Sequence, residues 1–331
     1  MNAQKNLYLV TGASGFVGGH LVDYLLQQGI SVRAMVRDEK KARKLKEKGA
    51  EVVVANMADA TSLAAAVDVV QGVYHIAALF RQAGFPEHVF HDVNAEGTRR
   101  LLDASIAAGV ERFVYCSTSG VMGHVKNPPA NEETPYSPGD MYQRSKMEGE
   151  KIALEYFRSN KISGVAIRPA MVYGPGDTRI LKLFRMIARR MFFFVGRGEA
   201  TVHWVDVRDL VRSFMLAMEK EEYNGEIYII AGESCTTLKK MVDLIATELN
   251  VSPPKIHLPV KPMQWLGSTC ETICTPLRIQ PPLFRRRVDF YTKSRAFDTS
   301  KAKQDLDFAP AQTFGQEIKD IIKDYKEHGY L

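Results

Sequence analysis

A tyrosine and a lysine four residues apart, Tyr142 and Lys146, are the residues best suited to move a proton. They stand at the start of a predicted helix over 142–160, where the i, i+4 spacing places both side chains on one face. A phenol with a pKa near ~10 is a poor base at neutral pH, and an adjacent ammonium group lowers that pKa by stabilising the phenolate. We predict that Tyr142 is a general acid or base for a hydroxyl proton and that Lys146 assists it.

Three consecutive hydroxyl side chains, Ser117, Thr118 and Ser119, follow a predicted strand over 112–117. In a parallel sheet, ligands lie at the carboxyl ends of the strands. One of these hydroxyls is therefore expected to hydrogen-bond a substrate oxygen as that oxygen gains negative charge. The residues by themselves leave all three open.

Three regularly spaced glycines, Gly12, Gly15 and Gly18, lie between a predicted strand over 7–11 and a helix that begins near Phe16. Gly12 permits a tight turn, Gly15 lets the backbone approach a pyrophosphate, and Gly18 lets the helix pack closely on the strand. The N-terminus of the helix adds free N–H groups and positive partial charge. This arrangement predicts a site for a dinucleotide cofactor.

The residues after the second predicted strand, over 31–36, bear on which dinucleotide is bound. An acid at this point holds the ribose hydroxyls in many NAD sites. Here Arg37 comes first, and its guanidinium suits a 2′-phosphate, with Lys40 or Lys41 nearby. The sequence favours NADP(H), and Asp38 leaves NAD(H) open.

The elements that position these residues alternate between strand and helix along the first 170 residues. Strands are predicted over 7–11, 31–36, 51–55, 73–76, 112–117 and 164–168, and helices over 16–28, 40–48, 61–69 with Thr61 as the N-cap, 93–108 and 142–160. Such alternation with short connections predicts right-handed βαβ units. The expected fold is α/β, a doubly wound parallel sheet of the Rossmann type.

After Arg168-Pro169 the alternation stops, and prolines interrupt residues 250–282. We therefore expect a dinucleotide-binding domain over 1–170 and a smaller, mainly substrate-binding region over 171–331. Segments near 200–232, such as 225–230, are expected to return to the main sheet.

Several motifs along nearly the whole chain resemble those of the extended short-chain dehydrogenase/reductase family. They are Thr11-Gly12-Ala13-Ser14-Gly15-Phe16-Val17-Gly18, His75-Ile76-Ala77-Ala78, Val93-Asn94-Ala95-Glu96-Gly97-Thr98, Tyr115-Cys116-Ser117-Thr118-Ser119, Tyr142-x-x-x-Lys146, Arg168-Pro169 with Val172-Tyr173-Gly174-Pro175-Gly176, and Asp298-Thr299-Ser300-Lys301-Ala302. The resemblance implies Tyr142 and Lys146 as the catalytic pair. Counted back from Gly123, the family register implies Thr118 as the third catalytic group.

The resemblance also implies which residues contact the cofactor. They are Gly12, Ser14, Gly15, Phe16, Val17, Gly18, Arg37, Asn56, Met57, Ala77, Ala78, Ser117, Tyr142, Lys146, Arg168, Pro169 and Val172. Asn56 stands where the family usually has an Asp that contacts the adenine amine, and an amide oxygen can accept the same bond. The side chains of His75, Arg168 and Asp206 are expected to be structural rather than catalytic.

The substrate is the least determined feature. Family members that act on nucleotide sugars grip the diphosphate with arginines, one of them just before the segment matching His203-Trp204, where this chain has Val202. Arg285, Arg286 and Arg287 could supply another. Aromatic and apolar residues in the C-terminal half, and the resemblance of 32–37 and 294–302 to the reductase and hydroxysteroid branches, favour a ketone or alcohol of low polarity.

Three functions follow from these residues. The first is an NAD(P)(H)-dependent oxidoreductase that acts on a secondary alcohol or ketone. The second is a nucleotide-sugar 4-epimerase or dehydratase that recycles its NAD internally. The third is a non-catalytic sensor of dinucleotides, against which the intact pair Tyr142 and Lys146 argues.

Composition and charge exclude several other classes. The chain has 331 residues, 45% hydrophobic and 25% charged, with a net charge of +6, which is typical of a globular protein. No apolar run approaches the ~20 residues of a membrane span, and the N-terminus carries no signal peptide, so we expect a cytoplasmic protein. Four scattered cysteines predict neither a disulfide framework nor a metal site.

Nucleic acid is not an expected partner. The resemblance to the family implies a homodimer through the helices predicted over 93–108 and 142–160.

Overall fold

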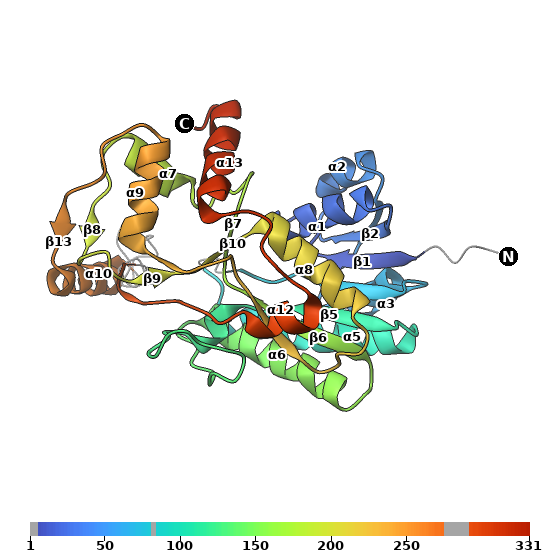
Figure 1. Ribbon diagram of the computed structural model, residues 1–331. Helices are drawn as coiled ribbons and strands as arrows, with labels where there is room; N and C mark the ends of the chain where they lie inside the picture. The colour runs from blue at the N-terminus through green and yellow to red at the C-terminus, as the bar shows by residue number, and fades with distance from the viewer. Residues whose placement is uncertain (1–5, 81–83, 275–290) are drawn as a thin grey trace.

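The computed structural model describes residues 6–80, 84–274 and 291–331. Its centre is a seven-stranded sheet in the order β11-β6-β5-β4-β1-β2-β3, in which every neighbouring pair is parallel. The strands are β1 (Leu7–Thr11), β2 (Ser31–Val36), β3 (Glu51–Val54), β4 (Gly72–His75), β5 (Arg112–Cys116), β6 (Ser163–Pro169) and β11 (Ile227–Ile230). The predicted doubly wound parallel sheet is confirmed (Figure 1).

Helices cover both faces of this sheet (Figure 1). On one face lie α1 (Phe16–Gln27), α2 (Ala42–Glu47), α8 (Val207–Glu219) and α12 (Ser300–Leu306). On the other lie α3 (Ala60–Val67), α5 (Gly97–Ala107) and α6 (Met141–Arg158). Residues of the central apolar strands, such as Val10 in β1 and Val73 in β4, are fully buried because helices exclude water from both faces of the sheet.

The remaining elements form a C-terminal lobe with its own core. Its helices are α7 (Leu181–Ala188), α9 (Leu238–Glu248), α10 (Val260–Cys274) and α13 (Phe314–Glu327). Three small strand pairs belong to it: β7 (Met171–Tyr173) with β10 (Trp204–Asp206), β9 (Thr201–Val202) with β12 (Thr236–Thr237), and β8 (Phe194–Val195) with β13 (His257–Leu258). Within residues 200–232, β11 joins the main sheet beside β6, whereas β10 pairs with β7 outside it.

Three local predictions differ from the structure. The predicted helix over 93–108 begins earlier, with α4 (Glu87–His91), and passes through a π-helical turn over Asp92–Glu96 into α5. The predicted helix over 40–48 begins as a 3₁₀ turn before α2. The expected N-cap Thr61 was wrong, because Asp59 caps α3 by accepting a hydrogen bond from the Thr61 N–H. A carboxylate one residue outside the helix is better placed for those free N–H groups.

No helix in the described part of the chain combines the length and the apolar character that crossing a bilayer requires.

Candidate active site

The glycine loop lies at the switch point of the sheet, where the chain leaves β1 and its neighbour β4 in different directions. Gly12 follows β1 with a φ of +67°, and a Cβ added to it would lie 2.9 Å from the Cα of Ala77, just after β4. A side chain at position 12 is therefore excluded by the backbone. The ends of β1 and β4 form the crevice in which doubly wound folds bind nucleotides.

Helix α1 starts at this crevice with its first-turn N–H groups unblocked by any side chain. Gly15 is the N-cap and makes no side-chain capping bond, and the first turn contains no acidic residue. A Cβ on Gly18 would lie 2.2 Å from the carbonyl oxygen of Gly12, so only glycine lets α1 approach the loop this closely. Free donors with positive partial charge fit a pyrophosphate.

Alanine substitutions at two neighbouring glycines of α1 are therefore expected to have opposite effects on stability. Gly18→Ala forces apart the helix and the loop, and we expect dinucleotide affinity to fall at least about tenfold and unfolding free energy to fall by roughly 2 kcal/mol. The matched control is Gly19→Ala, whose Cβ would meet its nearest atom, the Ala13 oxygen, at an ordinary 3.5 Å. It should preserve binding and gain up to about 1 kcal/mol of helix propensity. Calorimetric titration measures the dinucleotide affinity, and urea unfolding measures the free energy of unfolding. Equal affinities and equal stabilities of the two variants would contradict the packing argument.

Tyr142 and Lys146 stand in the first two turns of α6, which Asp140 caps by accepting a 2.8 Å hydrogen bond from the Gln143 N–H. Tyr142 is half-buried, and its ring meets that of Phe80 edge to face with centroids 4.9 Å apart. Lys146 is only 1% exposed. The phenol is therefore partly accessible to solvent, whereas the ammonium is buried.

The ammonium of Lys146 is held in a nearly water-free site. Its Nζ lies 4.2 Å from the centre of the Tyr115 ring, a cation–π distance. Burial lowers the pKa of Lys146 to about 8, while Cys116 and Glu150 act in the opposite direction. When it is protonated, the buried ammonium can stabilise a nearby anion strongly, because little water screens its charge.

The three hydroxyl candidates occupy different environments, and Ser119 is buried, at 7% exposed. Thr118 is half-buried, and its Oγ1 accepts a 3.1 Å bond from the Gly120 N–H, which leaves its own proton free to donate. Ser117 is 3% exposed, and its Oγ has no hydrogen-bond partner. A buried orphan hydroxyl at the end of a central strand fits a site that a bound ligand completes. The segment touches α6, since a Cβ on Gly120 would lie 3.0 Å from the side chain of Gln143.

Asn94, in the π-helical turn, is a site residue whose role the sequence analysis did not identify. Its amide accepts a 2.7 Å bond from the Leu79 N–H, and donates to the Leu79 oxygen and to Ser145 Oγ. Ser145 in turn donates to the carbonyl of Tyr142. Asn94 thus ties the chain after β4 to the start of α6. Its place inside the family motif over 93–98 was the available signal, and π-helical turns are common at functional sites.

His75 holds the end of β4 to the end of β1, as its predicted structural role requires. Thr98 has one hydroxyl proton and donates it to the Asn94 carbonyl, so His75 Nε2 must carry the proton of their 3.0 Å bond. His75 Nδ1 then accepts from Thr11 Oγ1 at 2.8 Å. Thr11 Oγ1 accepts from the two backbone N–H groups that follow His75. The imidazole is neutral and has no free nitrogen for catalysis.

This network predicts a pH dependence of stability. Burial, together with the charge of Lys146, lowers the pKa of His75 well below its usual 6.5. The unfolded chain therefore binds a proton that the folded chain does not, and stability is lost as the pH falls below about 6.5, by up to ~1.4 kcal/mol per pH unit for this group. Urea unfolding at pH 7.5 and 5.5 measures the loss. His75→Gln should lose less over that interval than the unsubstituted protein, and an equal loss would contradict the assignment.

The predicted adenosine-end contacts lie at the ends of β2 and β3. Arg37 is exposed directly after β2, whereas Asp38 Oδ1 accepts a 2.9 Å bond from the Lys40 N–H and caps the following 3₁₀ turn. Asn56 is exposed, and its amide oxygen accepts the Ala58 N–H. The Met57 side chain is 3% exposed and is part of the core beneath α3 and α5.

The other predicted cofactor residues separate into two groups. Ser14, Phe16 and Val17 surround the start of α1, and Ala78 follows β4, so they lie around the crevice. Pro169 ends β6 and Val172 lies in β7, on the side of the C-terminal lobe.

The side chains of Arg168 and Asp206 are occupied by internal contacts. Arg168 is 1% exposed and pairs with Glu150 through Nη2–Oε1 at 2.6 Å. Asp206 caps α8 and pairs with Arg208 at 2.8 Å. Both side chains therefore have the structural role that the sequence predicts, and a cofactor contact by Arg168 stays a prediction.

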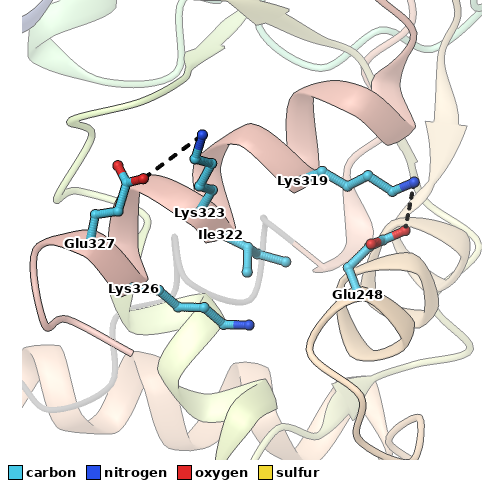
Figure 2. A pocket seen from close by; sticks show the side chains of 6 residues that line it. All are labelled: Glu248, Lys319, Ile322, Lys323, Lys326 and Glu327. Atoms are coloured by element: carbon cyan, nitrogen blue, oxygen red, sulfur yellow. Dashed lines mark ion pairs between the residues drawn. The ribbon is translucent and has the colours of Figure 1, made fainter.

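A shallow hollow elsewhere on the C-terminal lobe, between α9 and α13, is unrelated to these elements (Figure 2). Four of its charged side chains pair with one another, Lys319 with Glu248 at 3.7 Å and Lys323 with Glu327 at 3.9 Å. Its lysines belong to a solvated helix face rather than to a built anion site.

Comparison with known proteins places this site in a family. A model of the NAD dependent epimerase/dehydratase family matches residues 8–231. The chain is 30% identical over 335 residues to sterol demethylase protein B of Methylococcus capsulatus, covering 98% of this chain and 99% of that protein. It is 28% identical over 334 residues to a 3 beta-hydroxysteroid dehydrogenase/Delta 5-->4-isomerase of Mycobacterium tuberculosis, covering 96% of this chain and 90% of that protein.

A solved structure agrees in fold. The UDP-glucuronic acid 4-epimerase of Bacillus cereus in complex with NAD superimposes with a TM-score of 0.77 at 21% identity, covering 97% of this chain and 99% of that one. The matched region holds the glycine loop, the Tyr142 and Lys146 pair and the strand-end hydroxyls. This chain therefore belongs to the NAD-dependent epimerase/dehydratase family, the extended branch of the short-chain dehydrogenases/reductases.

Proposed function

We propose that this protein is an oxidoreductase that uses NADP(H), or failing that NAD(H), to interconvert a secondary alcohol and a ketone of low polarity. The observation that carries the proposal is the arrangement at the start of α6. A half-buried phenol, Tyr142, stands one helical turn from the buried ammonium of Lys146. Thr118 lies just after β5, in the segment that approaches α6 at Gln143. A nicotinamide, when bound, supplies or accepts the hydride.

The residues then divide the remaining chemistry among themselves. The phenol oxygen of Tyr142 gives a proton to the ketone oxygen, or takes it from the alcohol. Lys146 stabilises the phenolate left after that transfer and would also hold the nicotinamide ribose. Thr118, whose proton is free, donates a hydrogen bond to the substrate oxygen while charge develops there. The buried hydroxyl of Ser117, which lacks a hydrogen-bond partner in the described residues, would hydrogen-bond to the cofactor.

Two observations favour a substrate of low polarity. Sterol demethylase protein B and the 3 beta-hydroxysteroid dehydrogenase are named for sterol and steroid chemistry, and each aligns with nearly the whole chain. Val202, where nucleotide-sugar enzymes of the family have an arginine, is 1% exposed in β9, so no cation from that position faces a diphosphate. The other candidates, Arg285, Arg286 and Arg287, lie outside the described residues. Nucleotide-sugar epimerisation remains the second candidate, since the Bacillus cereus neighbour is such an epimerase.

The experiment that tests the proposal separates net redox from epimerisation. A thermal-shift screen with NADP and NAD, each with hydroxysteroids, hydrophobic ketones or nucleotide sugars, identifies ligands of the folded state by mass action. Turnover of the best ligand is then followed by nicotinamide absorbance. A steady absorbance change supports the oxidoreductase, conversion without net change supports the epimerase, and binding of dinucleotide with no conversion of any substrate class would leave only the sensor.

The preference between cofactors rests on Arg37. Its exposed guanidinium can pair bidentately with a 2′-phosphate, while the neighbouring Asp38 is already engaged as a cap. We expect Arg37→Gln to weaken NADP binding by about 10- to 100-fold and to change NAD binding less than about threefold. The control is Arg43→Gln on α2, where Arg43 forms a surface ion pair with Glu47. Equal losses for both cofactors would contradict the 2′-phosphate role.

The homodimer through α5 and α6 also stays a prediction. Both helices pack on the same face of the sheet, and each keeps a partly exposed side. Sedimentation velocity measures the state directly.

A further inference from the structure

The far end of the C-terminal lobe carries exposed apolar side chains that its own core does not cover. Trp265 is 78% exposed and Leu266 58% on α10, and Ile256, just before β13, is 60% exposed. An isolated exposed aliphatic residue needs no explanation, but a tryptophan this exposed, next to a leucine, on one helix face is unusual. We call the side of α10 that carries Trp265 and Leu266 the α10 face; Ile256 lies before this helix in the chain.

Helical geometry places the exposed residues of α10 together on one side of the helix. At about 100° per residue, Trp265 and Leu266 are adjacent on the wheel and share their side with exposed Pro262 and Thr269. The opposite side carries Gly267, which is buried. The helix thus turns its smallest residue toward the protein and its largest apolar residues outward.

The α10 face is fixed to the rest of the lobe through β13. The Phe194 N–H donates to the Ile256 carbonyl at 2.9 Å, and the Phe194 ring stacks on His257 with centroids 4.8 Å apart. A Cβ on Gly196 would lie 3.1 Å from Val260, at the start of α10. Figure 1 shows β8, β13 and α10 together at one extremity of the molecule, at the opposite end from α2.

The charged side chains described within residues 251–270 are cations. This stretch contains no Asp or Glu before Glu271, and its exposed ions are Lys255 and Lys261. Beside β8, the exposed Arg197 is followed by the exposed Glu199, so that segment adds no net charge. A second copy of the same cationic face would be repelled, whereas a surface of anionic headgroups would be attracted.

We propose that the α10 face docks this protein on the surface of an anionic phospholipid bilayer. Trp265 and Leu266 would enter the boundary between headgroups and acyl chains, with Lys255 and Lys261 on lipid phosphates. The inference is peripheral docking, because no described helix is long and apolar enough to span a bilayer. It stands apart from the proposed function, which does not need a membrane, although a substrate of low polarity partitions into one.

The test is co-sedimentation of the full chain with vesicles of phosphatidylcholine, alone or mixed with phosphatidylglycerol. We expect binding to the anionic vesicles and a blue shift of tryptophan emission, since Trp265 enters an apolar layer while the only other tryptophan, Trp204, is already buried. The double variant Trp265→Ala/Leu266→Ala should lower partitioning at least about tenfold. Lys255→Gln/Lys261→Gln should lower it about fivefold or more per charge and flatten its salt dependence.

The matched control is Val69→Ala, which removes a 73% exposed aliphatic residue from the connection between α3 and β4 in the main sheet and should leave partitioning unchanged. All of these positions are exposed, so melting temperatures should agree and folding defects do not confuse the readout. Failure to bind anionic vesicles overturns the proposal, as does binding that both double variants retain. Concentration-dependent dimerisation that Trp265→Ala abolishes, without vesicle binding, would overturn it in favour of a second copy. Turnover of a dissolved substrate reports on the proposed function separately.

Discussion

Tyr142→Phe is expected to lower kcat by about 10²- to 10⁴-fold, the usual contribution of a positioned general acid or base. The substitution removes one oxygen and keeps the ring that meets Phe80 edge to face. Dinucleotide affinity should change much less than kcat, because the glycine loop and the start of α1 are untouched and Tyr142 is one of many predicted cofactor contacts. Steady-state kinetics with the substrate from the screen, together with calorimetric titration of the cofactor, measures the two effects.

The matched control is Tyr330→Phe, which removes the same atom from a partly exposed tyrosine at the end of the C-terminal lobe. It should retain full activity. Lys146→Met should also lower kcat and should remove any pH dependence that belongs to its ammonium, whose pKa burial lowers to about 8. Full activity of Tyr142→Phe would show that another group transfers the proton.

Arg168→Met is expected to have the largest effect on stability, a loss of about 3–5 kcal/mol. Glu150 is fully buried, and the Nε and Nη2 of Arg168 contact both of its carboxylate oxygens at 2.6–3.2 Å. Removing the guanidinium leaves that carboxylate buried without its counterion. Urea unfolding followed by circular dichroism measures the loss.

Two comparisons isolate the cause of that loss. Arg43→Met breaks an ion pair whose side chains are 87% and 58% exposed, and should cost no more than about 0.5 kcal/mol. Arg168→Met/Glu150→Leu removes both charges and should recover part of the stability, because the uncompensated carboxylate is gone. A double variant no more stable than Arg168→Met would show that packing, not charge, accounts for the loss.

The sequence predicted most strands to within a residue, because each strand of this sheet is a short apolar run between turn residues. The helix over 93–108 was less well predicted. Its first part has a π-helical turn, which neither a strand period nor a helix period reveals. The N-cap of α3 was missed for a related reason, since Asp59 and Thr61 are both good capping residues and only the backbone geometry chooses between them.

What the sequence alone determined is local in origin. The glycine spacing before α1, the i, i+4 pair on α6 and the alternation of strand and helix all follow from residues within about one turn or strand of each other. The tertiary structure decided everything that joins distant segments. It buries Lys146 on the Tyr115 ring, ties the chain after β4 to α6 through Asn94, and leaves Trp265 uncovered. The reason is that burial and hydrogen-bond partners depend on how whole elements pack, and no local period encodes which side chain will lie opposite another.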